Sequence, residues 1–284
     1  MTDRIAVLGA GQMGNGIAHT FALAGYPVAM IDISTDALAR GRETIAKNLD
    51  RQIKKGTIAA DLKAPTLARI TDHTSFDAVK DATLIIEAVS ENLDLKFQIF
   101  ADLDRLAPAG AILATNTSSI SITEIAGRTR RPQSVIGMHF MNPVPMMALV
   151  EVIRGLPTSD ATLARVIELS KAVGKTPVEV KDYPGFVSNR ILMPMINEAV
   201  YCLMEGVGTE EAIDTVMKLG MSHPMGPLTL ADLIGLDTCL AILEVLHDGL
   251  GDSKYRPCPL LRKYVAAGWL GRKSGRGFYN YQAA

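Results

Sequence analysis

The sequence predicts an α/β protein, a largely parallel sheet wrapped by helices, followed by an all-α C-terminal part. In the first half, short apolar runs such as Ile5–Leu8 and Val28–Ile31 alternate with segments of helical periodicity. Apolar runs without polar alternation are typical of strands buried on both faces, and their alternation with helices is typical of a parallel sheet. From about residue 185 onward, apolar residues recur only at helical spacing, which favours a second, helical domain.

The expected elements are strands and helices in the first half and helices alone in the second. A turn at Asp182–Gly185 predicts the boundary between a first domain, 1–184, and a second domain, 185–284. Further strands are expected at 84–86, 111–114, 134–138 and 149–153. Helices are expected at 12–24, 36–55, 93–106, 190–205, 209–219, 228–248 and 258–267.

Composition excludes several classes of function. With 29 basic and 30 acidic residues in 284, the net charge of −1 offers no general attraction for nucleic acid or an anionic membrane. Three cysteines without CxxC spacing argue against a disulfide framework or a zinc site, and we expect buried free thiols. The N-terminus lacks the long apolar core of a secretory signal. We therefore expect a cytoplasmic protein with no membrane or nucleic-acid partner.

The first helix is expected to begin at a glycine-rich loop. Gly9, Gly11 and Gly14 form the pattern GxGxxG between a strand run and a helical run. Gly9 permits the tight turn, Gly11 lets the backbone approach a pyrophosphate, and Gly14 lets helix and strand pack closely. The N–H groups of the first helical turn, around Gln12 and Met13, and the positive end of the helix dipole can hold phosphates. The pattern predicts a Rossmann-type dinucleotide-binding domain.

Asp32 bears on the choice of dinucleotide. It lies 18 residues after Gly14, at the end of the second strand run. A carboxylate there can accept hydrogen bonds from a ribose 2′-hydroxyl and would repel a 2′-phosphate, so NAD is preferred over NADP. FAD uses the same loop, but the strand-rich cofactor domain of many flavoproteins is not evident.

His139 and Glu151 are the candidate proton-transfer pair. His139 ends an apolar run and precedes Phe140-Met141-Asn142-Pro143, so it lies at a strand end, where such sheets carry out their chemistry. Its near-neutral pKa suits removal of a proton from an alcohol. Glu151 lies inside the next apolar run, where a carboxylate is costly unless it has a partner. The alternative is a buried histidine and an unrelated glutamate on an edge strand.

Three other polar groups are candidates for a binding role. Thr115–Ser119 follows a strand run, where its hydroxyls can also cap a helix. Asn189 begins the helical domain. The third group is a basic face of the helix at 36–55, which can hold the phosphates of an anionic ligand or be a solvated face balanced by Glu43 and Asp50. Its members are Lys47, Arg51, Lys54 and Lys55.

Taken together, these motifs resemble those of the bacterial (S)-3-hydroxyacyl-CoA dehydrogenases over essentially the whole chain. The third residue of the family's His-Phe-Phe-Asn-Pro motif is here Met141, an apolar and adaptable residue that would reshape a pocket wall at most. No crotonase-like segment accompanies the motifs, so the resemblance is to the monofunctional enzymes. The matching blocks are Gly9–Gly14, Thr115–Ser119, His139–Pro143, Asp182–Arg190, Met217–Asp237 and Leu270–Phe278.

The resemblance implies a role for each matched residue. His139 would be the general base in oxidation and the acid in reduction, with Glu151 as its partner. Ser118 would hydrogen-bond the 3-oxygen region of the substrate, and Asn189 would hold the substrate from the second domain. Arg51 and Lys55 would contact coenzyme A, with Lys54 as a neighbour, and the helical domain would form a homodimer. The implied contacts with NAD are Asp32, Glu91, Lys96, Asn116, Asn142 and Lys273.

Two other functions stay open at this point. One is a sugar-acid or β-hydroxyacid dehydrogenase of similar plan. β-Hydroxyacid dehydrogenases usually use a lysine in the helical domain, and the segment 186–200 has none. A sugar-acid enzyme would not need the basic face around Arg51. The other is a non-catalytic NAD-binding protein, which measurable turnover would exclude.

Overall fold

The computed structural model describes residues 3–282, which form two compact units divided between Asp182 and Tyr183. The predicted α/β fold followed by an all-α part is confirmed, with the division two residues before the boundary expected from the sequence. None of the helices within residues 3–282 combines the length and apolar character needed to cross a bilayer.

An eight-stranded sheet forms the centre of the first unit. Its strand order is β3-β2-β1-β4-β5-β6-β7-β8, and β1 lies between β2 and β4, where the order reverses. A ligand site is expected at the carboxyl ends of the strands beside this reversal. The strands are β1 Ile5–Leu8, β2 Val28–Ile31, β3 Ile70–His73, β4 Leu84–Glu87, β5 Ile112–Thr115, β6 Val135–Phe140, β7 Leu149–Arg154 and β8 Thr176–Lys181.

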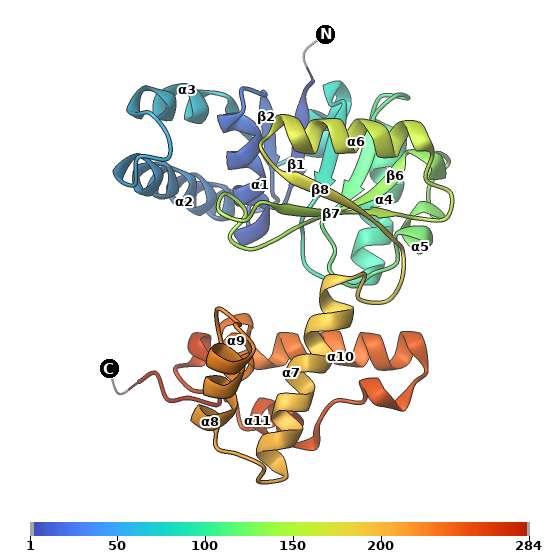
Figure 1. The fold of residues 1–284 in the computed structure, drawn as a ribbon. Helices are drawn as coiled ribbons and strands as arrows, with labels where there is room; N and C mark the ends of the chain where they lie inside the picture. Colours follow the sequence, from blue (N-terminus) through green and yellow to red (C-terminus); the bar gives the residue numbers. More distant parts are fainter. Residues whose placement is uncertain (1–2, 283–284) are drawn as a thin grey trace. The chain divides into compact units, whose positions relative to one another are not determined.

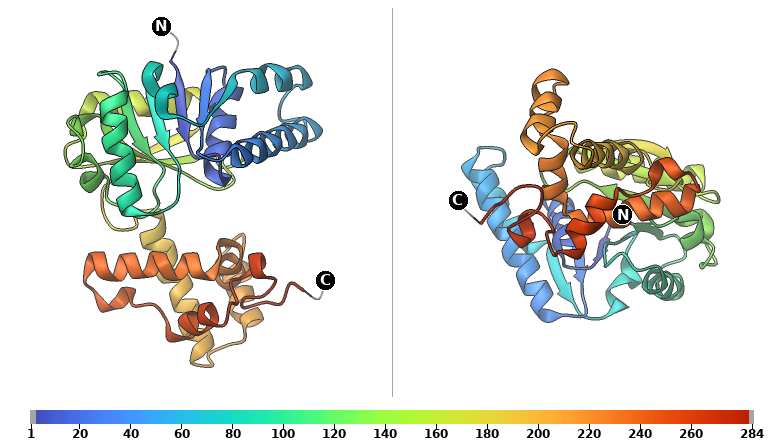
Figure 2. Two further views of the ribbon diagram at one scale, coloured as in Figure 1. Left: turned by 180° about the vertical axis from the view of Figure 1, so that it is seen from behind. Right: turned by 90° about the horizontal axis from the view of Figure 1, so that it is seen from below.

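Helices cover both faces of this sheet (Figures 1 and 2). Helices α1, α2 and α6 share one apolar core with the sheet. On the opposite face, α5 packs so closely that a Cβ on Gly137 of β6 would lie 3.0 Å from Ile122 Cδ1. The helices of this unit are α1 Gln12–Leu23, α2 Thr35–Lys54, α3 Lys63–Ala68, α4 Leu93–Leu106, α5 Ile122–Ala126 and α6 Asp160–Ala172.

The sheet departs from the expected parallel arrangement at β7. Strands β1 to β6 are parallel, but β7 runs antiparallel to β6, and β8 is parallel to β7. Only residues 141–148 connect β6 to β7, and a connection this short cannot carry the chain back for a parallel crossover. The antiparallel pairing places His139 directly opposite Glu151.

The second unit is all helical around its own apolar core, which includes the buried thiols Cys239 and Cys258. The expected single helix at 228–248 is wrong, because Gly235 has φ +105° and interrupts it. Cys202 is also a free thiol, but it is half-buried rather than buried. The helices are α7 Ser188–Met204, α8 Glu210–Thr215, α9 Pro227–Ile234, α10 Leu236–Leu250 and α11 Pro259–Ala266.

Candidate active site

The glycine-rich loop has the geometry that phosphate binding needs. A Cβ on Gly14 would lie 1.8 Å from the carbonyl oxygen of Gly9, so only glycine lets α1 pack this close to the β1 turn. Gly9 has φ +97°, a left-handed conformation that favours glycine. A Cβ on Gly11 would meet nothing within 4 Å, so the space beside its backbone is open. The N-cap of α1 is Gly11, and no side chain caps the helix, which leaves its N-terminus to a phosphate.

Asp32 lies directly beside this loop. It follows β2, and its Oδ2 accepts a hydrogen bond from the Ala10 N–H at 2.9 Å, while its Oδ1 accepts one from the Ser34 N–H at 3.0 Å. The two bonds hold the carboxylate against the loop, in the position from which Rossmann-type domains contact a ribose. These residues therefore fit a bound NAD.

His139 and Glu151 form a buried pair across β6 and β7. The distance between His139 Nδ1 and Glu151 Oε2 is 2.8 Å, and the two side chains are only 11% and 3% exposed. A carboxylate at Nδ1 orients the ring and stabilises an imidazolium, so that proton transfer falls to Nε2. Glu151 lies on an inner strand, because β8 covers the outer side of β7, so the edge-strand alternative is wrong.

A buried ion pair that the sequence did not reveal lies at the end of β4. Glu87 is 0% exposed and accepts from Lys96 Nζ at 2.6 Å, from the Thr115 hydroxyl at 2.6 Å and from the Val89 N–H at 2.8 Å. A buried carboxylate is tolerated only with such partners. The signal for it was an acidic residue at the end of an otherwise apolar strand run.

Glu91 continues this network toward Ser118. One of its oxygens accepts from the Ser118 N–H at 2.8 Å and from the Thr117 hydroxyl at 2.5 Å, and the other lies 3.4 Å from Lys96 Nζ. Burial alone would raise the pKa of Glu91, but the Lys96 ammonium and the hydroxyl and N–H donors outweigh it and hold the pKa below its ordinary value. Glu91 is therefore a carboxylate at neutral pH and fixes the loop that carries Ser118.

Two asparagines support neighbouring strand ends. Asn116 follows β5, and its Oδ1 accepts from the Phe140 N–H of β6 at 2.9 Å. Asn142 follows β6, and its Oδ1 accepts from Gln12 Nε2 at 3.1 Å. The loops after β1, β5 and β6 are therefore tied together along the edge of the sheet where the parallel strands end.

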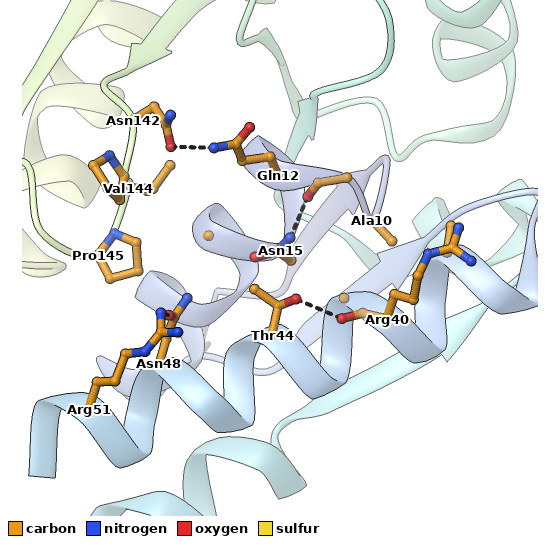
Figure 3. Close-up of a pocket in the computed structure, with 15 residues that line it drawn as sticks. Ala10, Gln12, Asn15, Arg40, Thr44, Asn48, Arg51, Asn142, Val144 and Pro145 are labelled. Atoms are coloured by element: carbon orange, nitrogen blue, oxygen red, sulfur yellow. Dashed lines mark hydrogen bonds between the residues drawn. The ribbon is translucent and has the colours of Figure 1, made fainter. Parts of the chain in front are cut away.

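Next to the loop lies a pocket of about 480 Å³, bounded by the start of α1, by α2 and by the connection from β6 to β7. Figure 3 shows Asn48 and Arg51 of α2 facing Pro145 across it. Arg51 also donates to Asn48 Oδ1 at 3.2 Å. The complete lining is Ala10, Gly11, Gln12, Asn15, Gly16, Ala37, Arg40, Gly41, Thr44, Asn48, Arg51 and Asn142–Pro145.

The expected basic face is only partly present at this pocket. Of its four residues, Arg51 alone lines the pocket. Lys47 forms an ion pair with Glu43 at 2.6 Å. α2 ends at Lys54, with Lys55 as its C-cap, so these two lysines lie beyond the lining residues. Helical spacing predicted the helix itself, but it could not show which of its turns faces the pocket.

Asn189 and Lys273 belong to the second unit. Asn189 lies in the first turn of α7, and its N–H donates to the Gly185 carbonyl at 3.1 Å. Lys273 Nζ donates to Asp237 Oδ2 at 2.8 Å, at the start of α10. The Asp237 carboxylate thus forms an ion pair with a lysine of its own unit.

A Rossmann-type loop, an acidic residue after β2 and a buried His–Glu pair at a strand end define an NAD-dependent dehydrogenase. Comparison with known proteins narrows this class. The NAD-binding domain of 3-hydroxyacyl-CoA dehydrogenase matches residues 4–183, and the C-terminal domain of the same family matches residues 185–281. The chain belongs to the 3-hydroxyacyl-CoA dehydrogenase family.

Its relatives match over nearly the full length. A probable 3-hydroxybutyryl-CoA dehydrogenase of Bacillus subtilis is 60% identical over 279 residues, which are 98% of this chain and 97% of that protein. A 3-hydroxybutyryl-CoA dehydrogenase of Bradyrhizobium diazoefficiens is 55% identical over 99% of this chain and 96% of that protein. The crystal structure of (S)-3-hydroxybutyryl-CoA dehydrogenase from Ralstonia eutropha has a TM-score of 0.96 at 54% identity, covering 99% of this chain and 100% of that one.

Proposed function

We propose that the protein interconverts (S)-3-hydroxybutyryl-CoA and acetoacetyl-CoA, with NAD as the hydride carrier. The observation that carries the proposal is the 2.8 Å contact between His139 Nδ1 and Glu151 Oε2 at the strand ends beside the nucleotide loop. When bound, NAD supplies the hydride chemistry at C3, and the chain supplies binding, orientation and proton handling.

His139 handles the proton in this proposal. In the oxidation, Nε2 takes the proton of the C3 hydroxyl, and in the reduction it returns a proton to the C3 oxygen. Glu151 keeps Nδ1 protonated and stabilises the imidazolium that forms. A base of this kind contributes about 10²–10⁴-fold to the rate.

Ser118 and Asn189 position the substrate. Ser118 is suited to hydrogen-bond the C3 oxygen, because Glu91 holds its loop at the end of β5. Asn189 has an amide that can hold the substrate from the helical unit. Such positioning lowers the entropic cost of reaching the reactive geometry.

The cofactor contacts in the proposal come from both units. Asp32 binds the adenosine ribose and selects NAD, since a 2′-phosphate would meet its carboxylate. Two further contacts are Lys96, which forms the buried ion pair with Glu87, and Glu91, which is partly exposed and lies 3.4 Å from Lys96 Nζ. The remaining contacts are the N–H groups of the Gly9–Gly14 loop, Asn116, Asn142 and Lys273.

The pocket along α2 is the proposed site for the nucleotide end of coenzyme A. Arg51 offers a guanidinium to a phosphate, and Asn48, a lining residue that the sequence did not suggest, offers an amide beside it. Lys55 lies one turn further and would meet a phosphate that extends beyond the pocket. Binding energy from this remote part of the substrate helps to orient the reacting end.

We infer that the protein forms a homodimer through its helical unit. We also infer that it is cytoplasmic. The surface of the helical unit carries large exposed apolar side chains, among them Ile191 of α7 at 68% and Leu219 at 81% exposure, and contact with a second copy would remove such side chains from water. Three free thiols suit a reducing compartment. Analytical ultracentrifugation at micromolar concentration should show a dimer, and a monomer under those conditions would contradict the inference.

The reaction is tested by following NADH absorbance with acetoacetyl-CoA, using free acetoacetate and NADPH as controls. The proposal predicts rapid loss of NADH with the thioester and little reaction in either control. Turnover with NADPH at the same rate would contradict the role of Asp32. Binding of NADH without any turnover of the thioester would direct the search to sugar acids or to a non-catalytic role.

A further inference from the structure

The connection between β6 and β7, residues 141–148, links the strands that carry His139 and Glu151. Its first part, Asn142–Pro145, forms one wall of the pocket along α2. The turn within it is short, since the N–H groups of Met146 and Met147 both donate to the Pro143 carbonyl, at 2.9 and 3.0 Å. A contact that fixes the conformation of this turn therefore also fixes the position of the pocket wall.

Lys175 holds the turn from the inner side. Its side chain lies just before β8 and is only 8% exposed, and its Nζ donates to the carbonyl oxygens of Val144 at 2.5 Å and Met147 at 2.7 Å. The next residue, Thr176, donates its N–H to the Ala148 carbonyl at 2.8 Å. Three carbonyls of one connection therefore converge on two consecutive residues.

Helix α1 holds the turn from the other side. Val144 is buried against Gly16, where an added Cβ would lie only 2.8 Å from Val144 Cβ. Asn142 accepts from Gln12 at the start of the same helix. The connection is therefore held both by α1 and by Lys175. Loss of the contacts with either one would let the pocket wall move.

The hydrogen-bond acceptors of the Lys175 ammonium indicate which part of the structure its charge stabilises. Most buried ammonium groups are expected to pair with a carboxylate, whereas the Lys175 ammonium donates to two main-chain carbonyls. Hydrogen bonds from a charged donor are about twice as strong as neutral ones. Their strength here acts directly on the backbone conformation of the turn.

We propose that Lys175 is a positioning residue for substrate binding, which holds the 141–148 connection so that Asn142–Pro145 keeps the shape of the pocket that receives the nucleotide end of coenzyme A. Lys175 itself does not line the pocket, so it acts through the backbone of the connection. The identity of the ligand rests on the proposed function, but the mechanical role of Lys175 does not.

The test uses Lys175→Met, which keeps the length of the side chain and removes the donor, and Lys175→Arg, which keeps a cationic donor. Lys171→Met is the matched control, since Lys171 is an exposed lysine on α6 of the same unit. Hydrogen exchange of the Met146 and Met147 amides reports the turn without any ligand. Lys175→Met should speed their exchange by about tenfold or more, with the amides of β1 and β4 unchanged. The Met146 and Met147 amides should exchange more slowly in Lys175→Arg than in Lys175→Met.

Kinetics separate positioning from general destabilisation. We expect Lys175→Met to raise KM for acetoacetyl-CoA by about tenfold, with kcat within about threefold of the parent. KM for the truncated thioester acetoacetyl-N-acetylcysteamine should not change, because it lacks the nucleotide. A parent protein inactive on acetoacetyl-CoA would contradict the proposed function alone. An active parent whose Lys175→Met variant matches Lys171→Met in exchange and in KM would overturn the role of Lys175, as would equal effects on both thioesters.

Discussion

His19 should make the stability of the first unit depend on pH in a specific direction. The imidazole lies on α1, is 0% exposed and has Gln52 of α2 and Lys175 nearby. Burial is the largest effect and disfavours the charged ring, Gln52 acts in the opposite direction, and the Lys175 ammonium adds to burial. Together they lower the pKa of His19 from 6.5 to about 4.

The direction of this pH dependence is set by which state, folded or unfolded, protonates His19 at the higher pH. As the pH falls, the unfolded chain protonates its imidazole near pH 6.5, whereas the folded chain does so only near pH 4. The contribution of neutral His19 to stability is therefore complete above about pH 6.5 and is lost progressively toward about pH 4. At about 1.4 kcal/mol for each pKa unit, the complete loss is about 3 kcal/mol. About 2 kcal/mol of it is lost by about pH 5.

The assay compares the parent with His19→Leu, which cannot titrate, by urea unfolding followed by circular dichroism at about pH 7.5 and about pH 5. All other groups titrate alike in both proteins, so the difference isolates His19. The parent should lose about 2 kcal/mol more than the variant between these pH values. His73→Leu, a half-exposed histidine in the same unit, serves as the control and should behave as the parent. Equal losses in the parent and in His19→Leu would show that burial of neutral His19 does not cause the pH dependence.

Three further predictions concern the site. Gly14→Ala adds a methyl group 1.8 Å from the Gly9 carbonyl oxygen, so NADH fluorescence titration should show a Kd raised by about tenfold or more; an unchanged Kd would contradict the packing argument. Glu151→Gln keeps the shape of the side chain but removes its charge, and kcat should fall by about 10²–10⁴-fold with NADH affinity retained; a normal kcat would exclude the role of the pair. Lys96→Met leaves the carboxylate of Glu87 buried without its cation, and urea unfolding should show a loss of about 3–5 kcal/mol; a loss below about 1 kcal/mol would show that the pair is not needed.

The sequence predicted the elements whose signals are local. The strands at Ile5–Leu8 and Val28–Ile31 and the helix at 93–106 have the expected bounds. In each, a continuous apolar run or a helical repeat lies next to a glycine or a cap, and these determine local structure without distant partners. The glycine-rich loop was predictable for the same reason, since its turn and its helix start are adjacent in the chain.

Features that depend on distant residues could not be predicted in this way. The strand β8 was missed because Thr176–Lys181 alternates and carries charges, and it exists only because β7 offers an open edge. The Glu87–Lys96 pair joins residues that a sequence reading assigns separately to a strand and a helix. Which turn of α2 faces the pocket depends on how that helix packs against α1, which helical spacing alone does not specify.

In the proposed reaction His139, held by Glu151, moves the proton during NAD-dependent reduction of a 3-oxoacyl-CoA. The most direct measurement is the rate of NADH consumption at saturating acetoacetyl-CoA for the parent and for His139→Gln, with NADH binding to both followed by fluorescence. The parent should consume NADH rapidly, and the variant should do so at a rate about 10²–10⁴-fold lower with its NADH affinity preserved. A variant as fast as the parent, or a parent that binds NADH and does not consume it, would contradict this role of His139.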